Sequence, residues 1–212
     1  MFISAATDSL DIRPAWPRPA QDTVRGLAAF PVAILADSLQ RMTVMDAGIV
    51  RLTGTGTLVG AALPIHTRGG DNLAIHRALD DAVEGDVLVV NGQGDANRAL
   101  VGDLIGEIMA IRGLRGVVVD GAVRDVDALG AMGLTVYARS VTPAGPFKNG
   151  PGQIGHPTAA GGQVVSPGDI IAADGDGVIV IPAARAQEVL ERAVGVLEAE
   201  DTLRARIKGD LS

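Results

Sequence analysis

Apolar and polar positions along the chain predict short helices near the N-terminus and buried strands beyond them. After a proline-punctuated arm over residues 1–20, the segments QDTVRGLAAF and VAILADSLQRM carry apolar residues at helical spacing, and Pro31 separates them. The apolar run GTLVGAALPI predicts a strand. In the segment GGDNLAIHRALDDAV, Asp71 is placed to cap a helix that carries Leu73 and His76 on one face. His76 is expected to be a packed polar residue.

The middle of the chain predicts a parallel α/β core. DVLVVN and GVVVD are continuous apolar runs, which are typical of strands buried on both faces. The segment LIGEIMAIRG between them predicts a helix, and RDVDALGAMG predicts a short helix closed by a glycine. A strand, a helix and a strand in this order imply parallel pairing in a right-handed unit. Ligands bind beyond the carboxyl ends of such strands, which are expected at Asn91 and Asp120.

Beyond residue 141 the pattern weakens and then returns. SVTPAGPFKNGPGQIGHPTAAGG is dense in glycine and proline and predicts a long, shaped loop, followed by the strands DIIAAD and GVIVIP. The remainder predicts an amphipathic helix whose stripe is apolar except at one position: Val189, Ala193, Val196, Glu200, Leu203 and Ile207. We therefore expect an arm over 1–20, an α/β domain over 21–182 and a C-terminal helix over 183–212 that docks between subunits.

Composition narrows the class of protein. The chain of 212 residues is 47% hydrophobic but only 2% aromatic, so Val, Ile, Leu and Ala must build its core, as suits an α/β fold. A net charge of −7 and the lack of a Lys/Arg cluster argue against nucleic acid as a partner. The sequence has no cysteine, no basic leader and no apolar run near the ~20 residues of a membrane span. A cytoplasmic protein without membrane contact is expected.

Three charged residues follow the predicted buried strands. Asp103 enters a helix whose first N–H groups can hold a carboxylate, Arg124 offers a planar fork for an anion, and Asp125 offers hard oxygens for Mg²⁺ or Mn²⁺. The alternative is that Asp103 caps its helix and that Arg124 and Asp125 form an ordinary surface pair. Spacing alone leaves both interpretations open. The neighbouring strands favour a common site.

The segments GDVLVVNGQGD, ALVGDLIGEIMAIRGLRGVVVDGAVRD and GPFKNGPGQI resemble the RraA-like family. This family includes divalent-metal 4-hydroxy-4-methyl-2-oxoglutarate and 4-carboxy-4-hydroxy-2-oxoadipate aldolases, and also the regulator of ribonuclease E activity. Asp103, twenty further residues and then Arg124 and Asp125 are similar to the motif of the aldolases. The resemblance implies a swivelling β/β/α-type single domain with central buried strands, flanking helices and the C-terminal amphipathic helix.

The resemblance also implies a division of roles at the site. A divalent metal, Mg²⁺ or Mn²⁺, would be held largely through water near Asp103 and Asp125, while Arg124 contacts the substrate. Backbone amides of the segment 102–105 would bind the carboxylate of pyruvate, through Gly102, Asp103, Leu104 and Ile105.

The aldolases complete this site with a glutamate from a neighbouring subunit, in a homotrimer or a hexamer. We assign that position to Glu200, although a solvated residue on a frayed helix is the other interpretation.

The expected function is therefore a divalent-metal class II aldolase that cleaves a 4-hydroxy-2-oxo acid of the 4-hydroxy-4-methyl-2-oxoglutarate type to pyruvate. Oxaloacetate decarboxylation is expected as a second activity of this lyase, because both reactions leave an enolate. A Schiff-base aldolase is a weaker alternative, since Lys148 and Lys208 are the only lysines. Lys148 could instead assist an anionic substrate. The rival from another class is a non-catalytic RraA-like protein that binds and regulates a ribonuclease or helicase.

Overall fold

The computed structural model describes residues 7–13 and 15–210. Residues 1–6 and 14 of the predicted arm, and residues 211–212 of the predicted C-terminal helix, lie outside the described residues. None of the helices in the described part of the chain combines the length and apolar character that crossing a bilayer requires.

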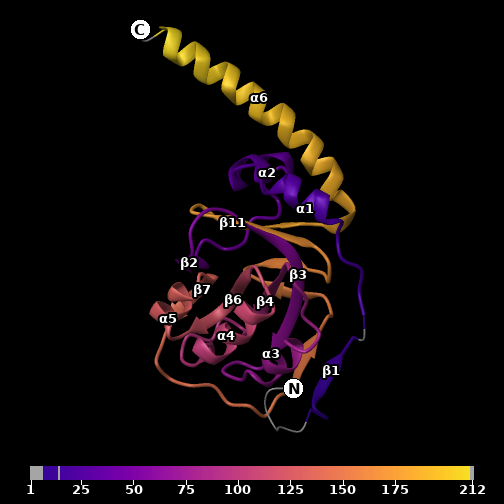
Figure 1. Ribbon diagram of the computed structural model, residues 1–212, viewed down its shortest axis with the longest axis vertical. Coiled ribbons are helices and arrows are strands. Elements are labelled where there is room, and N and C mark those ends of the chain that lie inside the picture. The colour runs from indigo at the N-terminus through magenta and orange to yellow at the C-terminus, as the bar shows by residue number, and fades with distance from the viewer. Residues whose placement is uncertain (1–6, 14, 211–212) are drawn as a thin grey trace.

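The helices gather in two groups at opposite ends of the molecule (Figure 1). The first group contains α1 (Gln21–Leu27), α2 (Val32–Ser38), the 3₁₀ turn η1 (Ala183–Arg185) and α6 (Ala186–Asp210). The second contains α3 (Leu73–Ala78), α4 (Asp103–Ile111) and α5 (Val126–Ala131). The predicted break between α1 and α2 is confirmed, because Pro31 precedes the first residue of α2.

A mixed sheet lies between the two helix groups. Its main path follows the order β1-β8-β3-β4-β6-β7-β2, while β5 pairs with β6, and β11 pairs with both β3 and β12. The strands on this sheet are β1 (Leu10–Ile12), β2 (Val50–Thr53), β3 (Leu58–Thr67), β4 (Asp86–Asn91), β5 (Ala99–Val101), β6 (Gly116–Val123), β7 (Thr135–Val141), β8 (Gly152–Ile154), β11 (Ile170–Asp174) and β12 (Gly177–Ile181). A separate hairpin joins β9 (Thr158–Ala160) to β10 (Gln163–Val165).

The predicted parallel core is present. β3, β4, β6 and β7 pair in parallel, with Val87 beside Gly116 at the start of the register and Asn91 beside Asp120 further along. Successive residues of β4 serve opposite cores, because Leu88 packs on the side of α3 and α4 while Val89 packs towards β9, β11 and β12. Burial on both faces explains why the strand sequence is continuously apolar.

Two details of the prediction are wrong. Asp120 does not end its strand, because β6 continues to Val123; its carboxylate instead accepts hydrogen bonds from Arg139 and from the N–H of Gly161. The sequence pattern also did not predict β5, which forms within the segment GQGDANRALVGD. The long loop beyond Val141 likewise contains β8 and β9.

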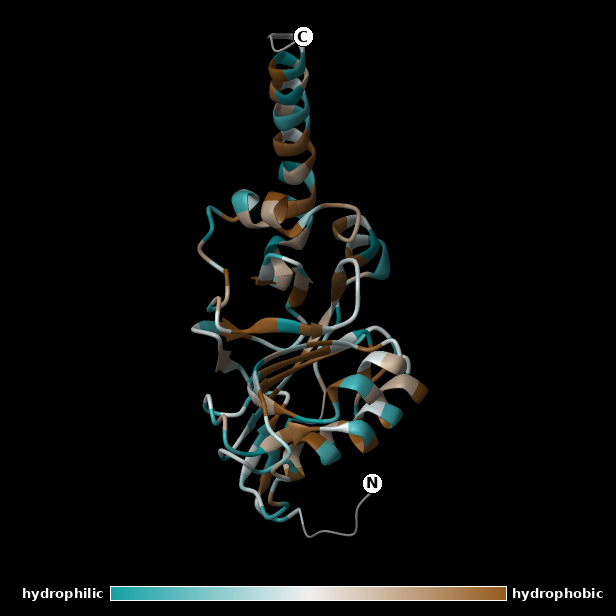
Figure 2. Ribbon diagram, turned by 90° about the vertical axis from the view of Figure 1, so that its left-hand side faces the viewer, coloured by the Kyte–Doolittle hydropathy of each residue, from teal (hydrophilic) through white to brown (hydrophobic). Residues whose placement is uncertain are grey.

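The helix α6 packs on the body with only its first half. Val189 and Ala193 are buried against α1 and α2, whereas Leu203 and Ile207 of the same stripe are 57% and 49% exposed. Figure 1 shows the second half projecting from the molecule, and Figure 2 shows hydrophobic and hydrophilic patches along this projecting rod.

Candidate active site

Two parallel strands bring the charged residues of the predicted site together. β5 pairs with β6 so that Val101 lies beside Val123, and the N–H of Arg124 donates to the carbonyl of Val101 at 2.9 Å. The residues that follow these strands are therefore neighbours. Asp103 begins α4 directly after β5, and Arg124 precedes α5 directly after β6.

Asp125 is the point at which this cluster converges. Its Oδ2 atom accepts a hydrogen bond from Arg124 Nε at 3.0 Å and a longer one from the N–H of Asp103 at 3.3 Å. The backbone of Asp125 is left-handed, with φ of 55°, which is uncommon for a residue with a side chain. Such a conformation persists where the surrounding structure enforces it, and it occurs more often at functional sites than elsewhere.

Glycine at position 102 allows the side chains of this cluster to approach the backbone closely. A Cβ atom added to Gly102 would lie 2.6 Å from Asp125 Oδ2 and 2.9 Å from Arg124 Nε. Both distances are shorter than side-chain carbons tolerate, so a larger residue would displace the carboxylate and the guanidinium.

A small cavity of about 100 Å³ opens beside these residues. Its walls come from α3, from β5 and the start of α4, from the end of β6, and from the loop after β7. The residues that line it are Asn72, His76, Ala99, Leu100, Gly102, Asp103, Leu104, Ile105, Arg124, Pro146 and Lys148. The cavity thus contains the predicted substrate-binding residues at 102–105, together with Arg124.

The wall that α3 provides is polar and buried. Asn72 is 4% exposed and His76 is 5% exposed, and they lie one helical turn apart. Burial, and to a smaller extent the positive charge of Lys148, lower the pKa of His76 from 6.5 to about 4. His76 is therefore neutral at pH 7. The expectation that it is a packed polar residue holds, but it packs into the wall of the cavity.

The loop that carries Lys148 is fixed to the start of α3 by Asp71. This fully buried carboxylate accepts hydrogen bonds from the N–H groups of Asn149 and Gly150 at 2.8 and 3.1 Å, and also from the N–H of Leu73 at 3.0 Å. Backbone bonds between Asn72 and Phe147 extend the attachment. Asp71, predicted as a helix cap, also holds one wall of the cavity in place.

The donor set fits a hydrated divalent cation. Asp125 Oδ1 and Asp103 Oδ2 accept no hydrogen bond from the residues that the structure describes, so each carboxylate keeps a free oxygen. Within the same residues, no group of three or more His, Cys, Asp or Glu side chains is arranged to hold a metal ion. Mg²⁺ and Mn²⁺ accept such a sparse set, because carboxylate oxygens suit both and Mg²⁺ in particular retains several waters.

The backbone amides of the predicted carboxylate site are partly engaged within the chain. The N–H of Leu104 donates to Asp103 Oδ1 at 2.8 Å, and that of Asp103 donates to Asp125. A bound carboxylate would have to replace these contacts, one of which is long.

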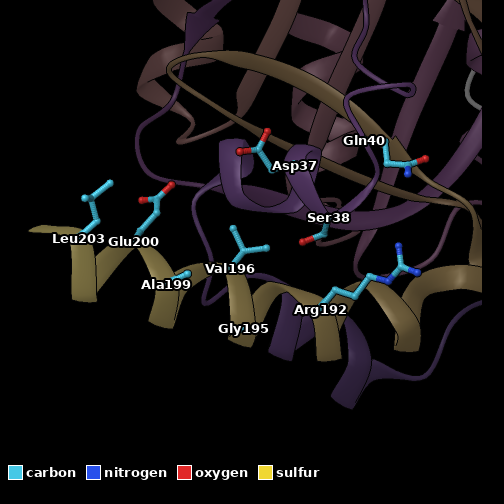
Figure 3. A pocket seen from close by; sticks show the side chains of 9 residues that line it. All are labelled: Asp37, Ser38, Gln40, Arg192, Gly195, Val196, Ala199, Glu200 and Leu203. Atoms are coloured by element: carbon cyan, nitrogen blue, oxygen red, sulfur yellow. The ribbon is translucent and has the colours of Figure 1, made fainter.

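Glu200 does not join the cavity within one chain. It lies on α6, pairs with Arg204 at 2.9 Å and lines a separate groove between α6 and α2. Figure 3 shows Glu200 and Val196 of α6 facing this groove together with Asp37 and Ser38 of α2. Any contribution of Glu200 to the cavity must come from a second copy of the chain.

Asn72 and Asp71 are the functional candidates that sequence reasoning missed. Asn72 and His76 are four residues apart at the start of a predicted helix, which places both on one face. That spacing was a usable signal. The facing wall of the cavity gave no such signal, because it comes from the loop that carries Lys148, which lies seventy or more residues further along the chain.

Comparisons with known proteins relate this chain to one protein family. The family described as RraA-like, Aldolase/RraA, matches residues 32–180. A protein of Halalkalibacterium halodurans, provisionally named a 4-hydroxy-4-methyl-2-oxoglutarate aldolase, is 35% identical over 189 residues, covering 89% of this chain and 90% of the relative. A protein of Ectopseudomonas mendocina with the same provisional name is 40% identical over 114 residues, which cover 54% of this chain and 70% of that protein.

Solved structures agree with the fold. Streptomyces coelicolor RraAS2, described as an unusual member of the RNase ES inhibitor RraA protein family, is 28% identical, with a TM-score of 0.81 over 89% of this chain and 100% of that chain. An uncharacterized protein from Pseudomonas syringae pv. tomato, 24% identical, matches with a TM-score of 0.83 over 92% of each chain and supports the fold alone.

Proposed function

Because the chain belongs to the RraA-like, Aldolase/RraA family, we propose that it is a divalent-metal aldolase that cleaves a 4-hydroxy-2-oxo acid to pyruvate. The 4-hydroxy-4-methyl-2-oxoglutarate type is the proposed substrate, and oxaloacetate decarboxylation is the proposed second activity. The observation that carries the proposal is the convergence of Arg124, Asp125 and the N-terminus of α4 at the mouth of one cavity.

The side chains at this mouth suit a 2-oxo acid. The Arg124 guanidinium can bind a carboxylate or an oxyanion through two parallel N–H groups, of which Nε now holds Asp125. Asp125 and Asp103 would hold the divalent cation, which would supply positive charge beside the 2-oxo and carboxylate oxygens. Arg124 adds a fixed positive charge where negative charge develops as the bond breaks.

Aldol cleavage needs one further group, which removes the proton of the 4-hydroxyl. As that proton leaves, a carbonyl forms at C4, the bond between C3 and C4 breaks, and its electron pair becomes the enolate of pyruvate. Proton return to C3 then completes the reaction. In the proposal, the base is a water activated by the metal or held by Asp103, whose Oδ2 atom accepts no hydrogen bond from the described residues. Oxaloacetate loses CO₂ instead and requires no such base.

A completed site would include a second copy of the chain. The free outer half of α6 carries Glu200 on an otherwise apolar stripe, which supports the proposed homotrimer or hexamer with Glu200 delivered to a neighbour's cavity. The oligomeric assembly and the role of Glu200 belong to the proposal.

A regulator that binds a ribonuclease or helicase is the second candidate, and the similarity to Streptomyces coelicolor RraAS2 is the observation that favours it. A regulator of this kind needs the fold and its surface but not the cluster of Arg124, Asp103 and Asp125. The presence of all three favours the enzyme.

The test is pyruvate release from 4-hydroxy-4-methyl-2-oxoglutarate and from oxaloacetate, in Mg²⁺, in Mn²⁺ and in EDTA. The wild type should turn over both substrates only with metal. Arg124→Ala should lower kcat/KM by about 100-fold or more, since removing one donor to a developing oxyanion has an effect of that order. Arg124→Lys should recover only part of the loss, because a lysine lacks the planar fork.

Arg25→Ala is the matched control, since Arg25 is an exposed arginine on α1 that pairs with Asp22. It should leave both reactions unchanged. Turnover no faster than the metal-only background with either substrate would refute the enzyme and leave the regulator.

A further inference from the structure

Two buried polar atoms of the cavity wall have no hydrogen-bond partner. They are Asn72 Oδ1 and His76 Nδ1, on residues that are 4% and 5% exposed. Buried polar groups are paired in the great majority of cases, and leaving one unpaired is unfavourable because it loses its hydrogen bonds to water. Two such atoms, on residues that are one helical turn apart and line the same cavity, indicate a place where a ligand completes the bonding.

The hydrogen bond that Asn72 already makes determines which chemical group the ligand must present to it. Asn72 Nδ2 donates to the carbonyl of Leu100 at 3.1 Å. Because a carbonyl oxygen can only accept, the amide nitrogen must face Leu100, and Oδ1 is left as an acceptor. An acceptor without a donor favours an O–H or N–H group and disfavours a carboxylate.

The surroundings of this acceptor narrow the ligand further. His76 is neutral at pH 7, so one ring nitrogen donates and the other accepts. The positive charge of Lys148, on the facing loop, favours a ligand with a negative charge nearby. The wall therefore suits an alcohol that lies close to an anionic group.

We propose that Asn72 and His76 bind the alcohol of the substrate, and that the 4-hydroxyl donates a hydrogen bond to Asn72 Oδ1. The inference rests on the proposed function and assigns the half of the substrate that Arg124 does not reach. Arg124 and the start of α4 then hold the 2-oxo carboxylate end, and the α3 wall holds the carbon that carries the hydroxyl. Asn72 and His76 thereby select a 4-hydroxy acid over a 2-oxo acid that lacks the alcohol.

Asp71 acts on this wall as a positioning residue. Its carboxylate holds the backbone of Asn149 and Gly150 and the start of α3 at once, so it sets the separation between Lys148 and the pair Asn72 and His76.

The experiment compares two reactions in the same variants. Asn72→Ser retains a hydroxyl that can donate to Leu100, and His76→Phe retains the ring but removes both nitrogens. Each should lower kcat/KM for the 4-hydroxy-2-oxo acid about tenfold more than for oxaloacetate, which has no alcohol. Any loss of folded protein affects both reactions equally and cancels in the ratio. An unchanged ratio in both variants would overturn the inference.

A binding measurement decides the question even if neither reaction occurs. Malate and succinate differ only in one hydroxyl, so the protein with Mg²⁺ is titrated with each while the ¹⁵N resonances of the imidazoles are observed. Malate should shift the His76 signals and bind about five- to tenfold more tightly than succinate, and Asn72→Ser should remove that difference. His76→Phe identifies the signals, and His66→Phe, outside the cavity, is the control.

Equal affinity for the two acids, or His76 signals that neither acid moves, would overturn the alcohol site. Absence of turnover with both 2-oxo acids, combined with selective malate binding, would refute the aldolase and retain the alcohol site.

Discussion

At the scale of single residues, Gly102 determines whether the charged cluster can assemble. In Gly102→Ala the new methyl group would lie 2.6 Å from Asp125 Oδ2, so the carboxylate and the Arg124 guanidinium must both move. We expect kcat/KM to fall about 10- to 100-fold, because small displacements of catalytic groups have effects of that order. The melting temperature should change little, since both displaced side chains are at the surface.

Gly195→Ala is the control for this change, because a Cβ atom there has nothing within 4 Å. Turnover and thermal melting of the two variants are compared with those of the wild type. An active Gly102→Ala protein would show that the observed contact between Arg124 and Asp125 is not needed for catalysis.

His76 makes stability depend on pH in a defined window. Its pKa is lowered from 6.5 to about 4 in the folded protein, so between these values the unfolded chain binds more protons and the free energy of unfolding falls as pH falls. The contribution of the neutral His76 side chain to the free energy of unfolding is present above pH 6.5 and is lost progressively towards pH 4. Its full size is about 3 kcal/mol at most.

The measurement is urea unfolding of the wild type and of His76→Phe at several pH values from 7 to 4. Carboxylates titrate in both proteins, so the difference between the two curves isolates His76. The wild type should lose more stability than the variant below pH 6.5. Parallel curves would mean that the imidazole is accessible to protons in the folded state.

The charged part of the site was predictable at this scale, and the neutral part was not. Asp103, Arg124 and Asp125 were expected to share a site because they follow buried parallel strands, which end at the same edge of a sheet. The strand that directly precedes Asp103 is β5, however, and its pairing with β6 was not predicted. The left-handed backbone of Asp125 and the unpaired Oδ1 atom of Asn72 depend on contacts made by distant segments, which local patterning does not encode.

At the scale of elements, α6 has two halves with different surroundings. Its stripe was predicted correctly as amphipathic, but only the half with Val189 and Ala193 finds a partner within the chain. We expect Leu203→Asp to break the proposed assembly, because it places a charge where an apolar contact with a second copy is expected. Light scattering coupled to gel filtration should show the wild type as an oligomer and the variant as a smaller species.

Ala205→Asp is the matched control, because residue 205 lies about 200° around the helix from residue 203 and is also exposed. It should leave the assembly intact. A wild type that is monomeric at micromolar concentration would contradict both the shared site and the role of Glu200.

Most of the strands that patterning failed to reveal are short, although the seven-residue β7 was not predicted either. β5, β8 and β9 have three residues each, which is too few for a periodicity to stand out from a loop. β5 and β8 form because a longer neighbour supplies their hydrogen bonds, namely β6 for β5 and β3 for β8, whereas β9 pairs with the equally short β10. Such strands are products of the tertiary structure.

At the scale of the whole molecule, the projecting half of α6 and the cavity lie towards opposite ends. α3 and α4, which border the cavity, are in the helix group remote from α1, α2 and α6 (Figure 1). A chain on its own therefore cannot bring Glu200 to Asp103. The apolar cores are independent of the charged cluster, because none of them contains Asp103, Arg124 or Asp125.

That independence has an evolutionary meaning. Arg124 and Asp125 each keep 36% of their side-chain surface exposed and contribute nothing to the apolar cores. In the proposed enzyme, one substitution at Arg124 would lower turnover about 100-fold or more and leave a folded protein with the same outer shape. Descendants of an enzyme built in this way can stop being catalysts in a single step and survive as binding proteins, so a shared ancestry of aldolases and inhibitors requires no intermediate that fails to fold.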